Sequence, residues 1–210
     1  MYLPEHFRES RPEVLQDILA RHPLATLVAN TSQGLSAHHV PLLWHSLTDG
    51  SGVLRGHIAR ANALWRQLER GASVLAIFTG SDHYVSPSWY PSKQQDGKAV
   101  PTWNYVAVHV RGHIRFIEQA AWLRAMVESL TEAHERDRPG RWHVSDAPAS
   151  YIESMLRAIV GFEIVVSGIE GKFKGSQNRS EADRMGVAAQ LRAADLSRAD
   201  INELVPGLKT

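Results

Sequence analysis

Hydrophobic and polar positions alternate strictly from Tyr105 to Phe116. One face of this segment is apolar and consists of Val106, Val108, Val110, Ile114 and Phe116. The opposite face carries Tyr105, His109, Arg111, His113 and Arg115. A period of two sustained over this length is the strongest strand signal in a single sequence. We therefore predict a strand with one face in a core and the other facing water or a ligand that prefers cations and aromatic rings.

The rest of the pattern predicts short strands with helices between them. Strands are expected at 24–30, 35–44, 53–58, 73–80 and 161–170, and Thr-Ser-Gln-Gly joins the first two as a hairpin. Helical spacing of apolar residues predicts helices between Ser10 and Pro23 and at 61–70, 119–136, 146–158, 180–193 and 197–204. Residues 81–104, rich in Ser, Pro, Tyr and Trp, predict a long functional loop.

Strands separated by turns, without regular βαβ alternation, predict a mainly β fold with some α structure. We expect an antiparallel β-barrel flanked by helices. The length of 210 residues favours a single domain, 1–210, with a C-terminal helical segment at about 180–210. Trp65 is expected in the core.

Composition narrows the range of functions. The chain has 23 Lys and Arg against 22 Asp and Glu, so its net charge is only +1, and any contact with DNA must come from a local patch or from a partner. The absence of cysteine excludes disulfides, thiolate chemistry and Cys-based zinc sites. No stretch approaches the roughly 18 apolar residues of a membrane span, and a cytoplasmic protein without membrane contact is expected.

Familiar catalytic and nucleotide-binding motifs are missing from the sequence. It has no G-x-G-x-x-G after a strand, no P-loop, no H-E-x-x-H and no G-x-S-x-G. His109 and His113 share a strand face but would lie about 13 Å apart, too far to bind one zinc ion. A histidine site assembled from separate strands stays open as an alternative. We assign no metal ligand and no catalytic acid or base.

Two segments could hold an anion. In 54–68 a strand passes through His57, and Arg60 and Asn62 then precede the expected helix, whose first amides would be free. The alternative is a solvated arginine and a simple helix cap. In 171–192 five basic residues (Lys172, Lys174, Arg179, Arg184 and Arg192) face two acidic ones. This cluster could form a second clamp on a phosphate or an electron-rich ring, or merely begin a solvated helix.

Five longer motifs connect these segments: MYLPEHF, HIARANALW, SDHYVSPSWY, VPTWNYVAVHVRG and KFKGSQNRSEADRMGV, in this order from residue 1 to about 187. Together they resemble the PaiB-type FMN-binding negative transcriptional regulators. The resemblance implies the FMN-binding split-barrel fold, related to pyridoxamine-phosphate oxidases, and a homodimer with flavin at the subunit interface. Gly175 departs from the family motif, which has leucine there, and glycine offers no apolar anchor and a freer backbone.

The resemblance also implies which residues bind FMN. The flavin phosphate would lie at the strand-to-helix segment, with the candidates His57, Ile58, Ala59, Arg60 and Asn62. Trp103 and Asn104 would lie at the mouth of the barrel, and the face with His109 and Arg111 would line a dimer or ligand surface or simply be solvated. The partner chain would contribute Lys174, Ser176, Gln177 and Arg179.

Two kinds of function remain open at this level. The first is a regulator in which FMN biases a dimer that represses transcription, contacting DNA directly through 172–192 or 136–141, or indirectly. The second is an FMN-dependent reductase or oxidase acting on a small molecule, with the aromatic loop covering a planar substrate. Haem binding through a histidine ligand is a third and more distant alternative.

Overall fold

The chain forms two compact units in the computed structural model, which describes residues 1–48 and 50–208, with only the backbone described at residue 96. Unit 1 comprises Met1–His22, Phe78–His109 and Glu170–Thr210, and unit 2 comprises Pro23–Ile77 and Val110–Ile169. Three long strands, β6 (Ser73–Val85), β7 (Thr102–Ile117) and β8 (Ile159–Lys174), contribute residues to both units. The assignment of the whole chain to one domain stays a prediction.

One antiparallel sheet connects the strands in the order β3-β2-β6-β7-β8-β5-β4, and β1 (Arg8–Glu9) pairs with β8. The further strands are β2 (Leu24–Thr31), β3 (Gly34–Pro41), β4 (Leu43–Ser46) and β5 (Gly52–Ala59). β3 contacts β5 in unit 2, but the path of backbone hydrogen bonds stays open between β3 and β4. The predicted antiparallel sheet with flanking helices is confirmed, and its barrel is not closed.

Gly56 explains how β5 comes so near the end of β3. A Cβ atom at Gly56 would lie 2.8 Å from the Leu42 side chain and 3.0 Å from the Pro41 carbonyl oxygen. Any larger residue would push these segments apart, so glycine permits the close approach.

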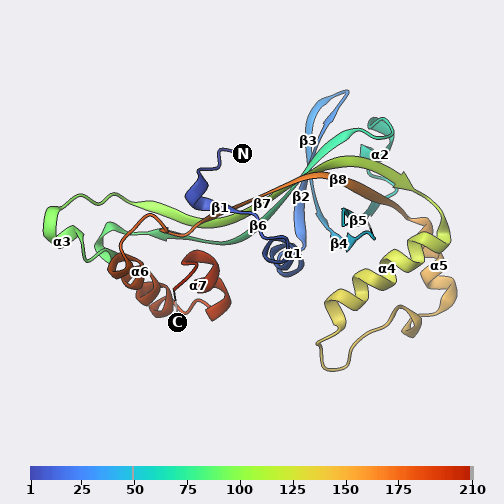
Figure 1. The fold of residues 1–210 in the computed structure, drawn as a ribbon. Coiled ribbons are helices and arrows are strands. Elements are labelled where there is room, and N and C mark those ends of the chain that lie inside the picture. Colours follow the sequence, from blue (N-terminus) through green and yellow to red (C-terminus); the bar gives the residue numbers. More distant parts are fainter. Residues whose placement is uncertain (49, 209–210) are drawn as a thin grey trace. The chain divides into compact units, whose positions relative to one another are not determined.

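The interior of unit 2 is apolar, as the alternation predicts. Val110 and Ile114 of β7 are fully buried, while Arg111 and His113 between them are exposed. Beside the strands, α4 (Ala120–Glu135) and α5 (Ala149–Arg157) lie side by side (Figure 1). Their apolar residues form a cluster with the short helix η3 (Val144–Asp146), built from Leu123, Val144, Ile152 and Leu156.

Unit 1 has its own core. Its helices are η1 (Glu5–Phe7), α1 (Pro12–Arg21), η2 (Pro87–Trp89), α3 (Lys93–Asp96), α6 (Glu181–Ala193) and α7 (Arg198–Leu204). Figure 1 shows α6 and α7 on the same side of the long strands. The core of this unit is a cluster of Val85, Tyr90, Val187, Ala188, Leu191, Ile201, Leu204 and Val205.

Several predicted boundaries are corrected. The predicted loop 81–104 begins as strand up to Val85 and becomes strand again at Thr102, because the polar residues Asp82 and Tyr84 occupy the exposed positions of an alternating strand. The predicted helix 61–70 is reduced to α2 (Leu64–Gln67). The C-terminal helical segment is present as α6 and α7, and residues 209 and 210 lie outside the described residues. Within the described part of the chain, no helix is both long and apolar enough to cross a membrane.

Candidate functional site

His57 is a half-buried histidine with a buried ring nitrogen, and it lies at the predicted phosphate segment in unit 2. It lies on β5 opposite Gly161 of β8. Its Nδ1 atom is shielded from solvent and has no hydrogen-bond partner in the described part of the chain. Burial lowers the pKa of His57 below its ordinary value of 6.5, so the neutral ring is favoured. Since buried polar atoms normally have a partner, Nδ1 is the strongest indication of a ligand in this segment.

Asn62 begins a chain of hydrogen bonds that ends on β3. Its side-chain amide lies 3.1 Å from His38 Nδ1, and Ser36 Oγ lies 2.8 Å from His38 Nε2. Because an amide nitrogen can only donate, His38 Nδ1 accepts and its Nε2 donates to Ser36. His38 and Ser36 were not among the site residues expected from the sequence, although their spacing of two places them on one face of the strand.

Arg60 is tied to the chain itself. Its guanidinium donates to the carbonyl oxygens of Arg157 at 2.8 Å and Ile159 at 3.0 Å, and it forms an ion pair with Glu118. Its backbone amide donates to Ala158 at 2.8 Å. These partners hold the arginine within unit 2, and a role in binding phosphate stays a prediction.

Backbone amides after Arg60 that we expected to be free have hydrogen-bond partners within the turn. The Asn62 amide donates to the Ala59 carbonyl at 2.9 Å, and the Asn62 side chain accepts from the Leu64 amide at 2.9 Å. The side chain thus satisfies a backbone donor inside the turn, and α2 is only four residues long. Ile58 is buried in the core and Ala59 is exposed. Both side chains are hydrocarbon, so only their backbone groups could bond to a ligand.

Asn104 is a structural residue of unit 1. It is 1% exposed and lies on the buried side of β7, whereas we had placed it at the mouth of the barrel. Its side-chain amide donates to the Leu204 carbonyl at 3.0 Å and to Ser176 Oγ at 3.1 Å. Ser176 is also buried, with a φ of 62°. The strict alternation of β7 carries Asn104 inward, since it is in phase with Val106.

The other residues of the predicted clamp also make their contacts within unit 1. Lys174 donates to Thr102 Oγ1 and to the Trp103 carbonyl. Gln177 accepts from the Gly175 amide at 2.7 Å and donates to the Phe173 carbonyl. The guanidinium carbon of Arg179 lies 4.9 Å from the centre of the Tyr90 ring. The turn after β8 is therefore firmly built, and the structure brings these residues together as a structural cluster.

Gly175 is required by packing in this structure. A Cβ atom there would lie 2.3 Å from Pro206 Cδ and 2.8 Å from the Leu204 carbonyl oxygen. Glycine therefore lets the segment after α7 lie directly against the end of β8, so the loss of the family's leucine goes together with close backbone packing.

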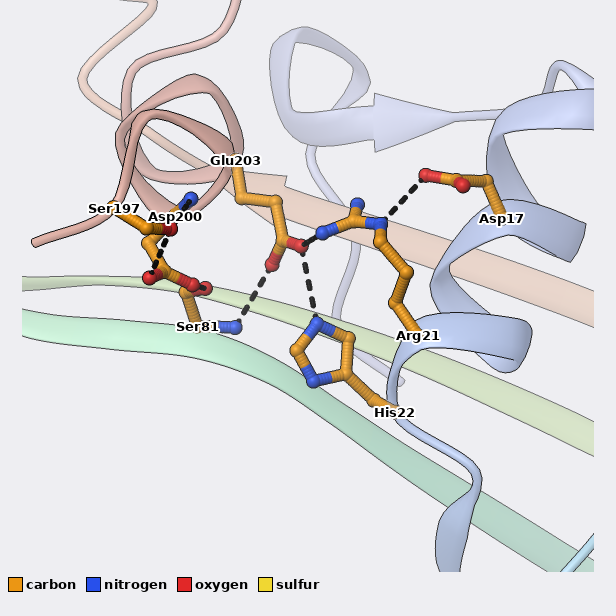
Figure 2. Close-up of polar contacts among 7 residues, drawn as sticks. All are labelled: Asp17, Arg21, His22, Ser81, Ser197, Asp200 and Glu203. Atoms are coloured by element: carbon orange, nitrogen blue, oxygen red, sulfur yellow. Dashed lines mark hydrogen bonds and ion pairs between the residues drawn. The ribbon is translucent and has the colours of Figure 1, made fainter. Parts of the chain in front are cut away.

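Unit 1 also contains a buried carboxylate that the sequence analysis did not single out. Figure 2 shows Glu203 of α7 accepting hydrogen bonds from the Ser81 amide at 2.9 Å and from His22, with Arg21 as its ion-pair partner. Asp200 accepts from the Ser81 hydroxyl at 2.6 Å. Hydrogen bonds and the Arg21 charge hold the pKa of Glu203 below its ordinary value against the opposing effect of burial.

A second buried carboxylate lies in unit 2. Glu163 of β8 accepts from Arg55 Nε at 2.7 Å and from Arg115 Nε at 2.8 Å. The two arginines lower its pKa although burial acts in the opposite direction. The face that carries Arg115 is therefore organised around an ion triad, which leaves one positive charge in excess.

Comparison with known proteins identifies the family. Residues 1–168 match the family model described as "Putative FMN-binding domain". The chain is 36% identical over 195 residues to the protease synthase and sporulation protein PAI 2 of Bacillus subtilis, covering 91% of this chain and 89% of that protein. It is 35% identical to protein AN0679 of Emericella nidulans, covering 89% of this chain and 88% of that protein. The chain belongs to this family, which confirms the resemblance seen in the motifs.

Solved structures support the fold. The FAD and haem binding protein of Mycobacterium smegmatis aligns with a TM-score of 0.61 at 18% identity, over 87% of this chain and 79% of that one. The flavocytochrome Anf3 of Azotobacter vinelandii aligns with a TM-score of 0.58 at 16% identity, over 85% of this chain and 75% of that one. Both have the split-barrel fold, so the predicted fold class is confirmed.

Proposed function

We propose that the chain binds FMN, with the phosphate end held where β5 leads into the turn before α2. The match of residues 1–168 to the FMN-binding family carries this proposal. The unpaired Nδ1 of His57 supports it, because a hydrogen-bonding ligand atom would complete that group. When bound, the flavin supplies hydride and electron transfer.

The residues of the segment have separable tasks in this proposal. His57, with its proton on Nδ1, donates a hydrogen bond to the ligand. The hydrogen bond between Asn62 and His38 fixes the orientation of both side chains. The Asn62 amide also sets the tautomer of His38, and Ser36 accepts from the Nε2 atom of that ring, which keeps the turn ready for the ligand.

Flavin fluorescence provides the test. The fluorescence of FMN should be quenched saturably by the protein. His57→Ala should raise the Kd at least tenfold, a loss of about 1.4 kcal/mol of binding free energy. His38→Ala should weaken binding as well. His39→Ala is the matched control, because His39 is the exposed neighbour on the opposite face of β3. Absence of saturable quenching in the wild-type protein would contradict the proposal.

We further propose that the chain acts as a homodimer through the exposed strand face of unit 1. Tyr84 and Trp103 are 44% and 54% exposed and pack edge to face with their ring centres 5.9 Å apart. Tyr105, two residues after Trp103 on the same strand, is half-buried, and the ammonium of the buried Lys172 lies 5.4 Å from the centre of its ring. Exposed aromatic patches of this kind are typical of protein interfaces. Trp103→Arg should shift the light-scattering mass from dimer to monomer, whereas Trp142→Arg, at a 42% exposed position of unit 2, should not.

We propose a regulatory role for this flavin protein, in which FMN biases a dimer that represses transcription directly or through a partner. The relationship to the protease synthase and sporulation protein PAI 2, whose name connects it with sporulation, supports this role. Salt-sensitive and sequence-selective retention of DNA by the FMN-loaded dimer should be measurable in a binding assay. Steady oxidation of a nicotinamide donor without such retention would instead favour the flavin-dependent oxidoreductase.

A further inference from the structure

Unit 2 contains a cleft of about 560 Å³ with two tryptophans in its walls. Trp65 belongs to α2 and Trp122 to α4, and the end of β7 also lines the cleft. The volume falls within the range of roughly 300–1,000 Å³ typical of small-molecule sites. The complete lining is Trp65, Leu68, Arg70, Arg115, Phe116, Ile117, Glu118, Gln119 and Trp122.

Both indole rings are held in place. Trp65 Nε1 donates to the Arg60 carbonyl at 2.9 Å, and the Arg66 guanidinium carbon lies 4.4 Å from the ring centre. Trp122 packs on Gly161, where a Cβ atom would lie 2.3 Å from Trp122 Cζ3. Trp65 is half-buried, so the expectation that it lies in the core is wrong. Trp122 is half-buried as well. Two fixed, partly open indoles can stack on a planar ligand at little cost in side-chain entropy.

The charges around the cleft favour an anion. Arg115 belongs to the triad with Glu163 and Arg55, which has one positive charge in excess. Glu118 is neutralised by its ion pair with Arg60. Arg70 is exposed and, among the described residues, makes no hydrogen bond or ion pair, so it adds a second positive charge. Guanidinium groups bind carboxylates with two parallel hydrogen bonds, which suits an aromatic acid.

We propose that the cleft between Trp65 and Trp122 binds a planar aromatic carboxylate, whose ring stacks on the indoles and whose carboxylate pairs with Arg70. This site lies outside the segment proposed for FMN and does not depend on it. The carboxylate would complete the bonding of Arg70, and the excess charge of the triad would strengthen the attraction. The ligand class follows from the walls and the charge, and the site needs no second protein chain.

Calorimetric titration with 2-naphthoate tests the site. The wild-type protein should bind the probe saturably with a Kd below about 1 mM. Arg70→Gln should raise that Kd at least fivefold, and the uncharged 2-naphthamide should bind at least fivefold more weakly than the acid. Arg192→Gln, an exposed arginine in α6 of unit 1, is the matched control and should leave the Kd unchanged within twofold.

A second variant examines the aromatic wall. Trp122→Leu should abolish the binding of 2-naphthoate, and circular dichroism should show that the variant folds. If it does not fold, Arg70→Gln alone decides. The proposal is overturned by absence of saturation at about 10 mM probe, by equal losses in Arg70→Gln and Arg192→Gln, or by competition between FMN and the probe.

Discussion

The Glu203 carboxylate accepts a hydrogen bond of 2.9 Å from the backbone amide of Ser81, although the two residues are 122 positions apart. This bond joins α7 to β6, and Arg21 and His22 bring the end of α1 to the same carboxylate (Figure 2). Glu203 is only 3% exposed, so its charge depends on these partners. The network therefore connects α1 with α7, the last helix of unit 1.

Glu203→Gln should destabilise the protein. The amide carries no charge to neutralise Arg21, and it has a single acceptor oxygen. Its NH2 group therefore meets a donor either at the Ser81 amide or at Arg21 and His22. The free energy of unfolding in urea should fall by about 2–4 kcal/mol. Asp17→Asn removes the exposed partner of Arg21 and serves as control, with an expected loss below about 1 kcal/mol. Equal losses in both variants would show that burial of Glu203 is not the cause.

His57 predicts a pH dependence of stability. Burial lowers its folded-state pKa below 6.5, so the unfolded chain binds a proton first as the pH falls. The free energy of unfolding should therefore be fully developed above pH 6.5 and should decline below that value until the folded ring itself is protonated. His57→Asn should flatten the decline, and His45, whose pKa burial also lowers, should retain part of it.

The exposed His39 gives the control for this experiment. His39→Asn should leave the slope of unfolding free energy against pH unchanged. Urea titrations between pH 5.5 and 7.5 should be made on the wild-type protein, His57→Asn and His39→Asn. If the slope is the same in His57→Asn and in the wild type, His57 is not the source of the pH dependence.

Gly175→Ala should destabilise unit 1 by about 1–3 kcal/mol, because the added methyl group meets Pro206 and the Leu204 carbonyl. Gly168→Ala, also in β8, is the matched control, since nothing lies within 4 Å of a Cβ atom there. Thermal unfolding measures both variants. A stabilised Gly175→Ala would mean that the turn tolerates a side chain.

Arg60→Ala separates a structural from a cofactor role. Because its guanidinium donates to two carbonyl oxygens and pairs with Glu118, the variant should lose about 1–3 kcal/mol of unfolding free energy. Its Kd for FMN should change less than that of His57→Ala. Unchanged stability together with a large loss of FMN affinity would assign Arg60 to the phosphate instead.

Local patterns predicted most of the strands and helices. The alternation around Val106 and Val108 placed β7 and its buried face, and the apolar spacing after Pro12 placed α1. The predictions failed at the end of β6, where Asp82 and Tyr84 occupy the exposed positions of the strand and their polar character favoured a loop. They also failed in the segment after Arg60, where the Asn62 side chain replaces a helical turn.

For the candidate site too, some features could be predicted from the sequence and others could not. The motifs predicted the family and directed attention to His57, whose Nδ1 atom is shielded from solvent without a hydrogen-bond partner among the described residues, and to Asn62, which bonds to His38. They could not predict that Asn104 would donate to the Leu204 carbonyl, since this hydrogen bond joins residues 100 positions apart.

By itself the sequence determined the periods of its strands and helices, its lack of cysteine chemistry and its family motifs, because each of these depends on neighbouring residues or on composition. Only the tertiary structure decided the partners of Glu203, the two carbonyls that hold Arg60, and the cleft between Trp65 and Trp122. These features depend on which distant segments meet in the folded chain, because hydrogen bonds and packing require atoms to be close in space and not close in sequence. No local pattern encodes that distance.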